Sequence, residues 1–155
     1  DVAGINGKMS EINAAFGLLQ LSHIGAALGE RKRIDELYRS LLKDVKGIRC
    51  LEDAGEKVAN YSYFPILVEE NFPLTRDELY QKLKDHNIFA RRYFYPLITE
   101  FPMYKILASA SPGGLPMANK YAKTVLCLPI YPSFSDSDQR RVVNLIKSQQ
   151  FMVKD

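Results

Sequence analysis

The chain has 155 residues, of which 46% are hydrophobic and 25% are charged, and its formal net charge is +3. This length supports one domain with a hydrophobic core, and the composition excludes a disordered or low-complexity chain. The mild charge disfavours a nucleic-acid-binding surface, and no uninterrupted apolar run approaches the roughly 18 residues that span a bilayer. We therefore expect a globular protein without nucleic-acid or membrane partners.

The first residues, Asp1 to Gly4, carry neither an initiator methionine nor a signal-peptide pattern. We interpret them as the interior of a fold and expect this chain to be a piece of a larger cytoplasmic protein. Cys50 and Cys127 lie far apart in apolar surroundings. Buried free thiols are the simplest interpretation of these cysteines, with a disulfide or a metal-binding pair as the alternative.

Apolar residues recur at helical spacing over residues 9–28, for example at Ile12 and Phe16. Small residues occupy other sides of this segment, which predicts a helix that is buried or lies at an interface. A second helix is predicted over residues 31–45, and Gly47 is placed to end it.

A strand is predicted over residues 61–68, where Pro65 lacks the N–H that a sheet requires and so indicates an edge or irregular position. Thr75 and Glu78 form a capping box that opens the next helix, which Asn87 can end in the left-handed conformation. Four further elements are predicted in chain order: a strand over residues 88–93, a helix over 116–125, a strand over 126–130 and a helix that starts at Ser135.

This order of elements predicts an α+β fold. We expect residues 1–28 to form a hinge segment and connector helix, and residues 29–155 to form one small α/β domain. The usual catalytic patterns are absent from the sequence. His23 and His86 lie on different predicted helices without metal-ligand spacing, so neither a metal site nor a complete active site is expected.

Two segments are chemically unusual. In the first, residues 4–11, Asn6 and Lys8 precede a long helix. Asn6 or Ser10 could cap that helix, or the segment could bind a phosphate through amide donors and a cation at the positive helix end.

The second segment, residues 89–97, combines two arginines with several aromatic residues before a proline. Core packing beneath a solvated arginine face is one interpretation. The other is a wall for a ring-shaped polar ligand, because tyrosine suits a sugar and arginine suits a phosphate or carboxylate.

These two segments, in this order, resemble the DegT/DnrJ-type family of sugar-nucleotide aminotransferases, which are fold-type-I enzymes that use pyridoxal phosphate (PLP). The resemblance is most specific from Gly4 to Leu21 and continues at Tyr93 to Leu97 and at Cys127 to Pro132. It implies a long connector helix followed by the small C-terminal domain, which is a small mostly antiparallel sheet with helices on one side. The large PLP-binding domain is then absent and the Schiff-base lysine lies upstream, so no catalytic residue is expected in this chain.

The resemblance also implies a homodimer with its active site at the interface, where Asn6 contacts the PLP phosphate of the partner subunit. The implied reaction moves an amino group from glutamate to a nucleotide-linked keto-deoxy sugar for polysaccharide biosynthesis. The segment from Tyr93 to Ile98 looks like that of members acting on thymidine-diphosphate sugars at carbon 3. The implied substrate-binding residues are Lys8, Arg92, Tyr93, Phe94 and Tyr95.

Two positions depart from the family pattern. Lys8 stands where many members have arginine, which keeps the charge without the bidentate fork. Ile98 stands where many members have histidine, so the sugar contact of that histidine is not carried over. A PLP-dependent sugar dehydratase and a non-catalytic binding or regulatory homologue remain open alternatives, and the presence of the upstream lysine distinguishes them.

Overall fold

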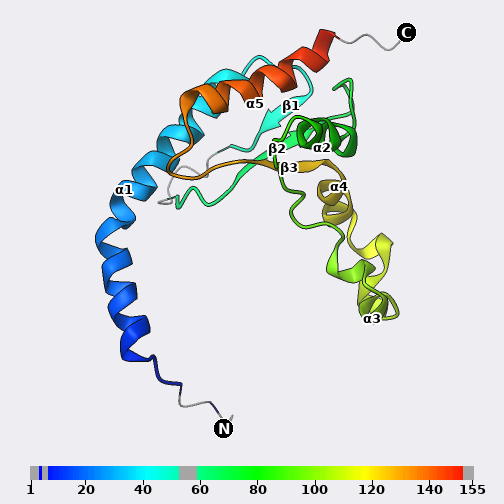
Figure 1. Ribbon diagram of the computed structural model, residues 1–155. Helices are drawn as coiled ribbons and strands as arrows, with labels where there is room; N and C mark the ends of the chain where they lie inside the picture. Colours follow the sequence, from blue (N-terminus) through cyan, green and yellow to red (C-terminus); the bar gives the residue numbers. More distant parts are fainter. Residues whose placement is uncertain (1–3, 5–6, 53–58, 152–155) are drawn as a thin grey trace.

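The computed structural model describes residues 4, 7–52 and 59–151. Two helices, α1 and α5, run side by side along one face of a small sheet, and α4 lies on the other side of that sheet (Figure 1). The elements are α1 (Glu11–Leu42), β1 (Ile48–Cys50), β2 (Phe64–Val68), α2 (Arg76–Asp85), α3 (Pro102–Lys105), α4 (Pro116–Thr124), β3 (Val125–Leu128) and α5 (Asp136–Ser148).

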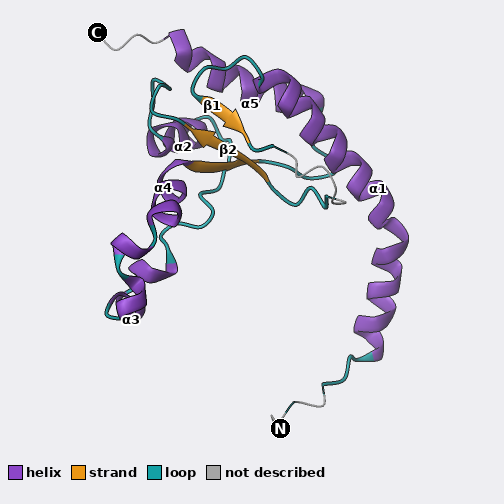
Figure 2. Ribbon diagram, turned by 180° about the vertical axis from the view of Figure 1, so that it is seen from behind, coloured by secondary structure: helices purple, strands orange, loops and turns teal. Residues whose placement is uncertain are grey.

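The sheet is antiparallel, with the strand order β1-β2-β3 (Figure 2). Alternate residues of β2 and β3, such as Phe64, Ile66 and Leu126, enter one hydrophobic core with side chains of α1, α2 and α5. Cys127 points away from that core, as strand alternation requires. The α+β class and the small antiparallel sheet are therefore confirmed.

The helix predicted over residues 9–28 and the helix predicted over residues 31–45 are one continuous helix, α1, of 32 residues. Gly29 does not interrupt this helix. In the turn that follows, Arg33 contacts both a neighbour on α1 and residues near the start of α5. Its Nε forms an ion pair with Glu30 at 3.1 Å, while its Nη2 donates to the carbonyl of Phe134 and its Nη1 contacts Asp136 at the start of α5. The prediction of two separate helices was wrong, because glycine only weakens a helix interior and Arg33 also binds residues near the start of α5 that are distant in sequence.

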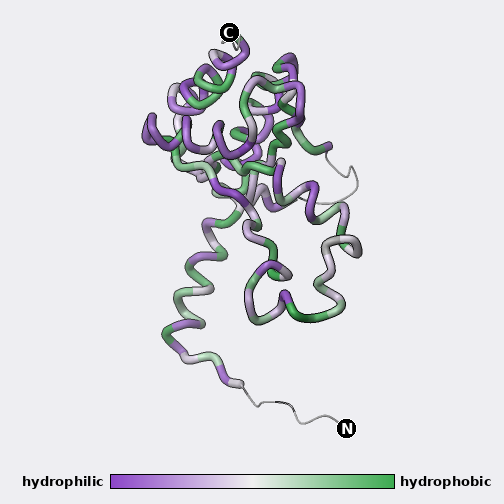
Figure 3. The backbone as a smooth tube through the Cα atoms, turned by 90° about the vertical axis from the view of Figure 1, so that its right-hand side faces the viewer, coloured by the Kyte–Doolittle hydropathy of each residue, from purple (hydrophilic) through white to green (hydrophobic). Residues whose placement is uncertain are grey.

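The described residues bury side chains in the second half of α1, and they leave its first half largely exposed. Tyr38 stacks on Phe64 with ring centroids 4.8 Å apart, and its hydroxyl donates to the carbonyl of Pro129 at 3.2 Å. In the first half, Ile12 is 82% exposed and Phe16 is 62% exposed. Figure 3 shows hydrophobic residues recurring along this projecting part of the helix. The predicted burial of the first half is thus not provided by the described residues themselves.

The helix α1 is long and apolar enough, by length and composition, to cross a membrane, with a mean hydropathy of 1.2 over 18 residues. Polar residues such as Gln20, Ser22 and His23 interrupt its apolar residues, so the sequence still contains no uninterrupted apolar run of this length. A single helix of this kind is weak evidence for a membrane, because the core helix of a soluble protein meets the same criterion.

Pro65 lies in β2, the central strand, so an edge strand was the wrong prediction, but β1 does not extend to Pro65 and leaves that flank unpaired at this position. The partner of Pro65 on β3 is Cys127. The backbone N–H of Cys127 donates to the carbonyl of Arg91 at 2.8 Å, and its carbonyl accepts from the N–H of Arg91 at 2.9 Å, so both groups of Cys127 point away from Pro65. The Pro65–Cys127 pair is therefore one that exchanges no hydrogen bonds. On the other flank, β1 ends at Cys50 opposite Ile66, so no neighbour requires a donor from Pro65.

The predicted strand over residues 88–93 is reduced to one bridge between Arg91 and Cys127. The capping box of Thr75 and Glu78 is present as predicted, and Asn87 adopts a φ of 58° after α2. Ser135 caps α5 by accepting a hydrogen bond from the backbone N–H of Asp138. The prediction that Gly47 ends a helix was wrong, because α1 ends at Leu42.

Gly47 instead makes the turn into β1 at a φ of +78°, and a Cβ there would lie 2.5 Å from the backbone nitrogen of Phe72. We expect Gly47→Ala to lower the free energy of unfolding by about 1–3 kcal/mol, measured by urea denaturation. Gly25→Ala is the matched control, since no atom lies within 4 Å of a Cβ at that helical position. We expect that control to be stabilised by about 0.5–1 kcal/mol. Equal unfolding midpoints for the two variants would contradict the steric assignment.

Candidate functional site

The segment that follows the Arg91–Cys127 bridge forms one wall of a cavity of about 570 Å³. We call this cavity the aromatic pocket. Its lining is mostly apolar, with few polar groups, which suits the ring of an organic ligand. Tyr93, Phe94 and Tyr95 lie together in this lining, and Arg92 stands beside them. The complete lining is Arg92, Tyr93, Phe94, Tyr95, Pro96, Leu97, Ile98, Thr99, Phe101, Leu115 and Ala118.

Arg92 is engaged by the protein itself. Its Nη1 donates to Oδ1 of Asp77 at 2.8 Å, and its guanidinium carbon lies 4.5 Å from the ring centre of Tyr80 and 4.9 Å from that of Tyr95. A carboxylate and two aromatic rings therefore already hold this cation, which fixes its orientation.

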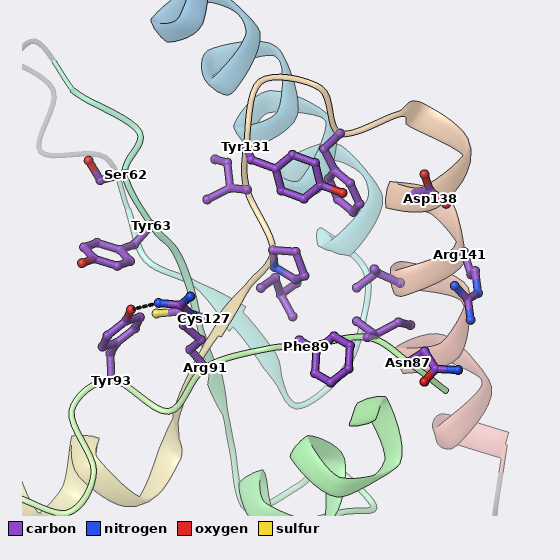
Figure 4. A pocket seen from close by; sticks show the side chains of 16 residues that line it. Ser62, Tyr63, Asn87, Phe89, Arg91, Tyr93, Cys127, Tyr131, Asp138 and Arg141 are labelled. Atoms are coloured by element: carbon purple, nitrogen blue, oxygen red, sulfur yellow. Dashed lines mark hydrogen bonds between the residues drawn. The ribbon is translucent and has the colours of Figure 1, made fainter. Parts of the chain in front are cut away.

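A second cavity, of about 600 Å³, lies on the other side of Tyr93. We call it the arginine pocket. Figure 4 shows Arg91 and Tyr93 on one side of it and Arg141, from α5, on the opposite side. Arg91 donates from Nη1 to the hydroxyl of Tyr93 at 2.6 Å, and this hydrogen bond raises the pKa of the Arg91 guanidinium above its ordinary value. The side chain of Arg91 remains exposed to solvent.

Tyr93 lines both cavities, so the two pockets adjoin at its ring. Tyr63 meets that ring edge-on with centroids 4.8 Å apart, and Phe94 meets it at 5.0 Å. The two neighbouring arginines therefore line different pockets. Arg91 lines the arginine pocket, whereas Arg92 lines the aromatic pocket.

The described residues of the predicted phosphate-binding segment, 4 and 7–11, lie away from both pockets. Asn6 is outside the described residues, and Lys8 is exposed just before α1, at the end of the helix that projects from the sheet (Figure 1). Ser10 caps this helix by accepting from the backbone N–H of Asn13 at 3.3 Å, which assigns to Ser10 the capping role that was open between Asn6 and Ser10. One copy of the chain therefore does not bring Lys8 to the residues of the aromatic pocket.

Sequence reasoning did not identify the residues that support these pockets. Asp77 and Tyr80 come from α2 and Arg141 comes from α5, far from Arg92 in sequence. The acidic first turn of α2 was visible in the sequence only as part of a capping box. Among the residues that the structure describes, no group of three or more histidine, cysteine, aspartate or glutamate side chains could hold a metal ion.

Residues 1–147 match the DegT/DnrJ/EryC1/StrS aminotransferase family. The chain belongs to this family. It is 54% identical over 144 residues to the dTDP-4-amino-4,6-dideoxy-D-glucose transaminase of Escherichia coli, covering 93% of this chain and 38% of that protein. It is 48% identical to the transaminase of the same description from Shigella dysenteriae, covering 95% of this chain and 40% of that protein.

The fold of this aminotransferase family member is shared with solved structures. The crystal structure of DesI in the presence of its TDP-sugar product matches with a TM-score of 0.84 and 29% identity, covering 96% of this chain and 38% of that one. The chain therefore spans about two fifths of the length of these relatives.

Cys50 and Cys127 are both free thiols, as expected, but only Cys127 is buried, whereas Cys50 is partly exposed. Burial raises the pKa of Cys127 to about 11. At pH 8 we expect its thiolate population to be roughly a hundredfold smaller than that of a thiol with pKa 9. Its alkylation by iodoacetamide should therefore accelerate with pH up to about 11.

The Cys50→Ser background isolates the reaction of Cys127, and mass spectrometry measures its rate between pH 7 and pH 11. The same protein unfolded in urea is the control and should level off near pH 9. A native rate that levels off at the same pH as the unfolded control would contradict the burial of this thiol.

Proposed function

We propose that this chain is the hinge segment and connector helix, residues 1–28, and the small domain, residues 29–155, of a PLP-dependent sugar-nucleotide aminotransferase. The observation that carries this proposal is the family match over residues 1–147 together with the aromatic pocket at Tyr93, Phe94 and Tyr95. The coverage of about two fifths of the relatives supports a remaining part that supplies the large domain and the lysine that anchors PLP.

The proposed substrate is a thymidine-diphosphate-linked keto-deoxy sugar, with glutamate as the amino donor. Both relatives are described as dTDP-4-amino-4,6-dideoxy-D-glucose transaminases. That description places the transferred amino group at carbon 4, and it therefore favours carbon 4 over the carbon 3 suggested by the resemblance of the segment from Tyr93 to Ile98. We propose polysaccharide or related glycan biosynthesis in the cytoplasm as the setting.

The aromatic pocket is the proposed sugar site. Tyrosine rings present a flat apolar face and a hydroxyl, which matches a deoxy sugar with both apolar and hydroxyl-bearing faces. Tyr93, Phe94 and Tyr95 supply these faces, and Arg92 stands at the edge where a phosphate or hydroxyl would approach. Ile98 makes this part of the lining apolar.

The start of α1 is the proposed contribution to the cofactor site of a partner subunit. The exposed cation of Lys8 and the exposed first turn of α1 are chemically suited to a phosphate, as the end of a helix with unsatisfied N–H groups is in general. Asn6 would donate to the PLP phosphate, and Lys8 would contact the substrate. When bound, PLP supplies the electron sink that amino transfer requires.

A homodimer also accounts for the exposed apolar side chains of α1. Met9, Ile12, Phe16 and Leu19 are all more than half exposed. A row of large apolar side chains on a projecting helix indicates a surface that other protein covers. We propose that the large domain and the partner subunit cover it.

We expect the full-length enzyme, loaded with PLP, to convert dTDP-4-keto-6-deoxyglucose and glutamate to the 4-amino sugar and 2-oxoglutarate. Mass spectrometry of the sugar product and coupled detection of 2-oxoglutarate measure this reaction. A 3-keto isomer tests the alternative carbon. A sugar product that has lost water and carries no new nitrogen would indicate a dehydratase, and a protein that binds no PLP would indicate a non-catalytic homologue.

We expect Asn6→Ala in the full-length dimer to weaken PLP retention by about tenfold, because one hydrogen bond to a charged phosphate is lost. Equilibrium dialysis followed by cofactor absorbance measures the retention. Asn144→Ala, at an exposed position of α5 outside both pockets, is the control and should retain PLP as the parent does. Equal retention by all three proteins would remove the proposed role of Asn6.

A further inference from the structure

The first turn of α2 holds two charged residues in a fixed position. The backbone N–H of Thr75 donates to the Glu78 carboxylate at 2.7 Å, and the backbone N–H of Glu78 donates back to the Thr75 hydroxyl at 3.3 Å. Arg76 and Asp77 lie between these two capping residues, so their backbone direction is set by the cap. Asp77 also lies where a negative charge interacts favourably with the helix dipole.

Arg76 is a buried cation, with only 2% of its surface exposed. Its Nη1 donates to the carbonyl of Val125, at the start of β3, at 3.1 Å. Its Nε lies 2.9 Å from Oδ1 of Asp77, an ion-pair distance, although this N–H is not directed along a hydrogen bond. A buried arginine requires compensation for lost solvation, and here Asp77, the Val125 carbonyl and the Tyr95 ring supply part of it, while Nη2 has no hydrogen-bond partner among the described residues.

Asp77 contacts two arginines, Arg76 and Arg92. The same oxygen, Oδ1, lies 2.9 Å from Nε of Arg76 and 2.8 Å from Nη1 of Arg92. Both guanidinium groups lie over the ring of Tyr95, at 4.8 Å for Arg76 and 4.9 Å for Arg92. Tyr95 is therefore oriented by two cations, which a single carboxylate holds in place.

We propose that Arg76, Asp77 and Arg92 act as positioning residues that orient Tyr95 in the aromatic pocket for the nucleotide-linked sugar. This inference rests on the proposed function for the identity of the ligand. It assigns Arg92 a role that acts through Tyr95. Asp77 is the residue on which the arrangement depends, because it contacts both arginines.

The test is Asp77→Asn in the full-length enzyme, which removes the charge and keeps the size of the side chain. We expect the KM for the nucleotide-linked keto sugar to rise about tenfold, which corresponds to about 1.4 kcal/mol of binding. The half-reaction with glutamate alone, followed by the absorbance of the cofactor, should keep its rate, because that step does not use the sugar pocket. A rise in KM without a matching loss in the glutamate half-reaction separates positioning from general damage.

Asp85→Asn is the matched control on the same helix, because Asp85 accepts a hydrogen bond from Gln81 and belongs to none of these contacts. It should leave both KM and the half-reaction unchanged. Arg92→Lys is a second variant, which keeps the charge but loses the planar group over the rings. It should raise KM in the same direction as Asp77→Asn. In a Tyr95→Ala background, Asp77→Asn should have no further effect on KM.

A readout that is independent of activity is the ¹⁹F resonance of 3-fluorotyrosine placed at position 95. We expect Asp77→Asn to shift this resonance and Asp85→Asn to leave it in place. An unshifted resonance in Asp77→Asn overturns the proposal, as does an additive effect of Asp77→Asn in the Tyr95→Ala background. A parent enzyme that acts on no nucleotide sugar would contradict the proposed function, while the ¹⁹F result would still decide the role of Asp77.

Discussion

The contact of Tyr38 with the sheet is the constraint on which the rest of this structure depends. Its ring is fully buried, it stacks on Phe64 of the central strand, and its hydroxyl reaches the carbonyl of Pro129 just after β3. Burial raises the pKa of this hydroxyl, so it remains a neutral donor. One side chain of α1 thereby fixes the helix to β2 and to the segment that leads into α5.

That attachment anchors the hydrophobic core on one face of the sheet, beside the segment that carries the two pockets. The face under α1, α2 and α5 is filled by the hydrophobic core, in which Leu79, Leu126 and Ile146 are fully buried. Both pockets involve the segment around Tyr93, which leaves the sheet after the bridge between Arg91 and Cys127. The packed face therefore supplies rigidity, and the segment leaving the sheet supplies the chemical groups, as is common for sites carried by loops.

The elements that were predicted correctly are those that local residues determine. The capping box of Thr75 and Glu78 and the left-handed Asn87 involve neighbours in sequence, and they occur in the structure as predicted. The continuity of α1 through Gly29 and the central position of Pro65 depend on partners far along the chain. A hydrogen-bond pattern in which Pro65 needs no donor cannot be recognised before the order of the strands is known.

The same division applies to the candidate site. The clustering of Tyr93 to Tyr95 was evident in the sequence because these residues are consecutive. The different surroundings of Arg91 and Arg92 were not evident, because the partner of Arg92 is Asp77, 15 residues earlier on α2. Sequence composition alone treats the two arginines as equivalent cations.

Their difference follows from backbone geometry and has a chemical consequence. Successive side chains of an extended segment point to opposite sides, so Arg91, at the bridge, and Arg92 face different pockets. Arg92 meets a carboxylate and two rings, which hold it in one orientation, whereas Arg91 meets the neutral hydroxyl of Tyr93 and stays exposed. The carboxylate of Asp77 largely offsets the positive charge of Arg92, so Arg92 attracts an incoming anion only weakly. The phenol of Tyr93 offsets none of the charge of Arg91. Of the two arginines, Arg91 therefore presents the greater positive field to solvent, and Arg92 contributes chiefly through the aromatic residue that it orients.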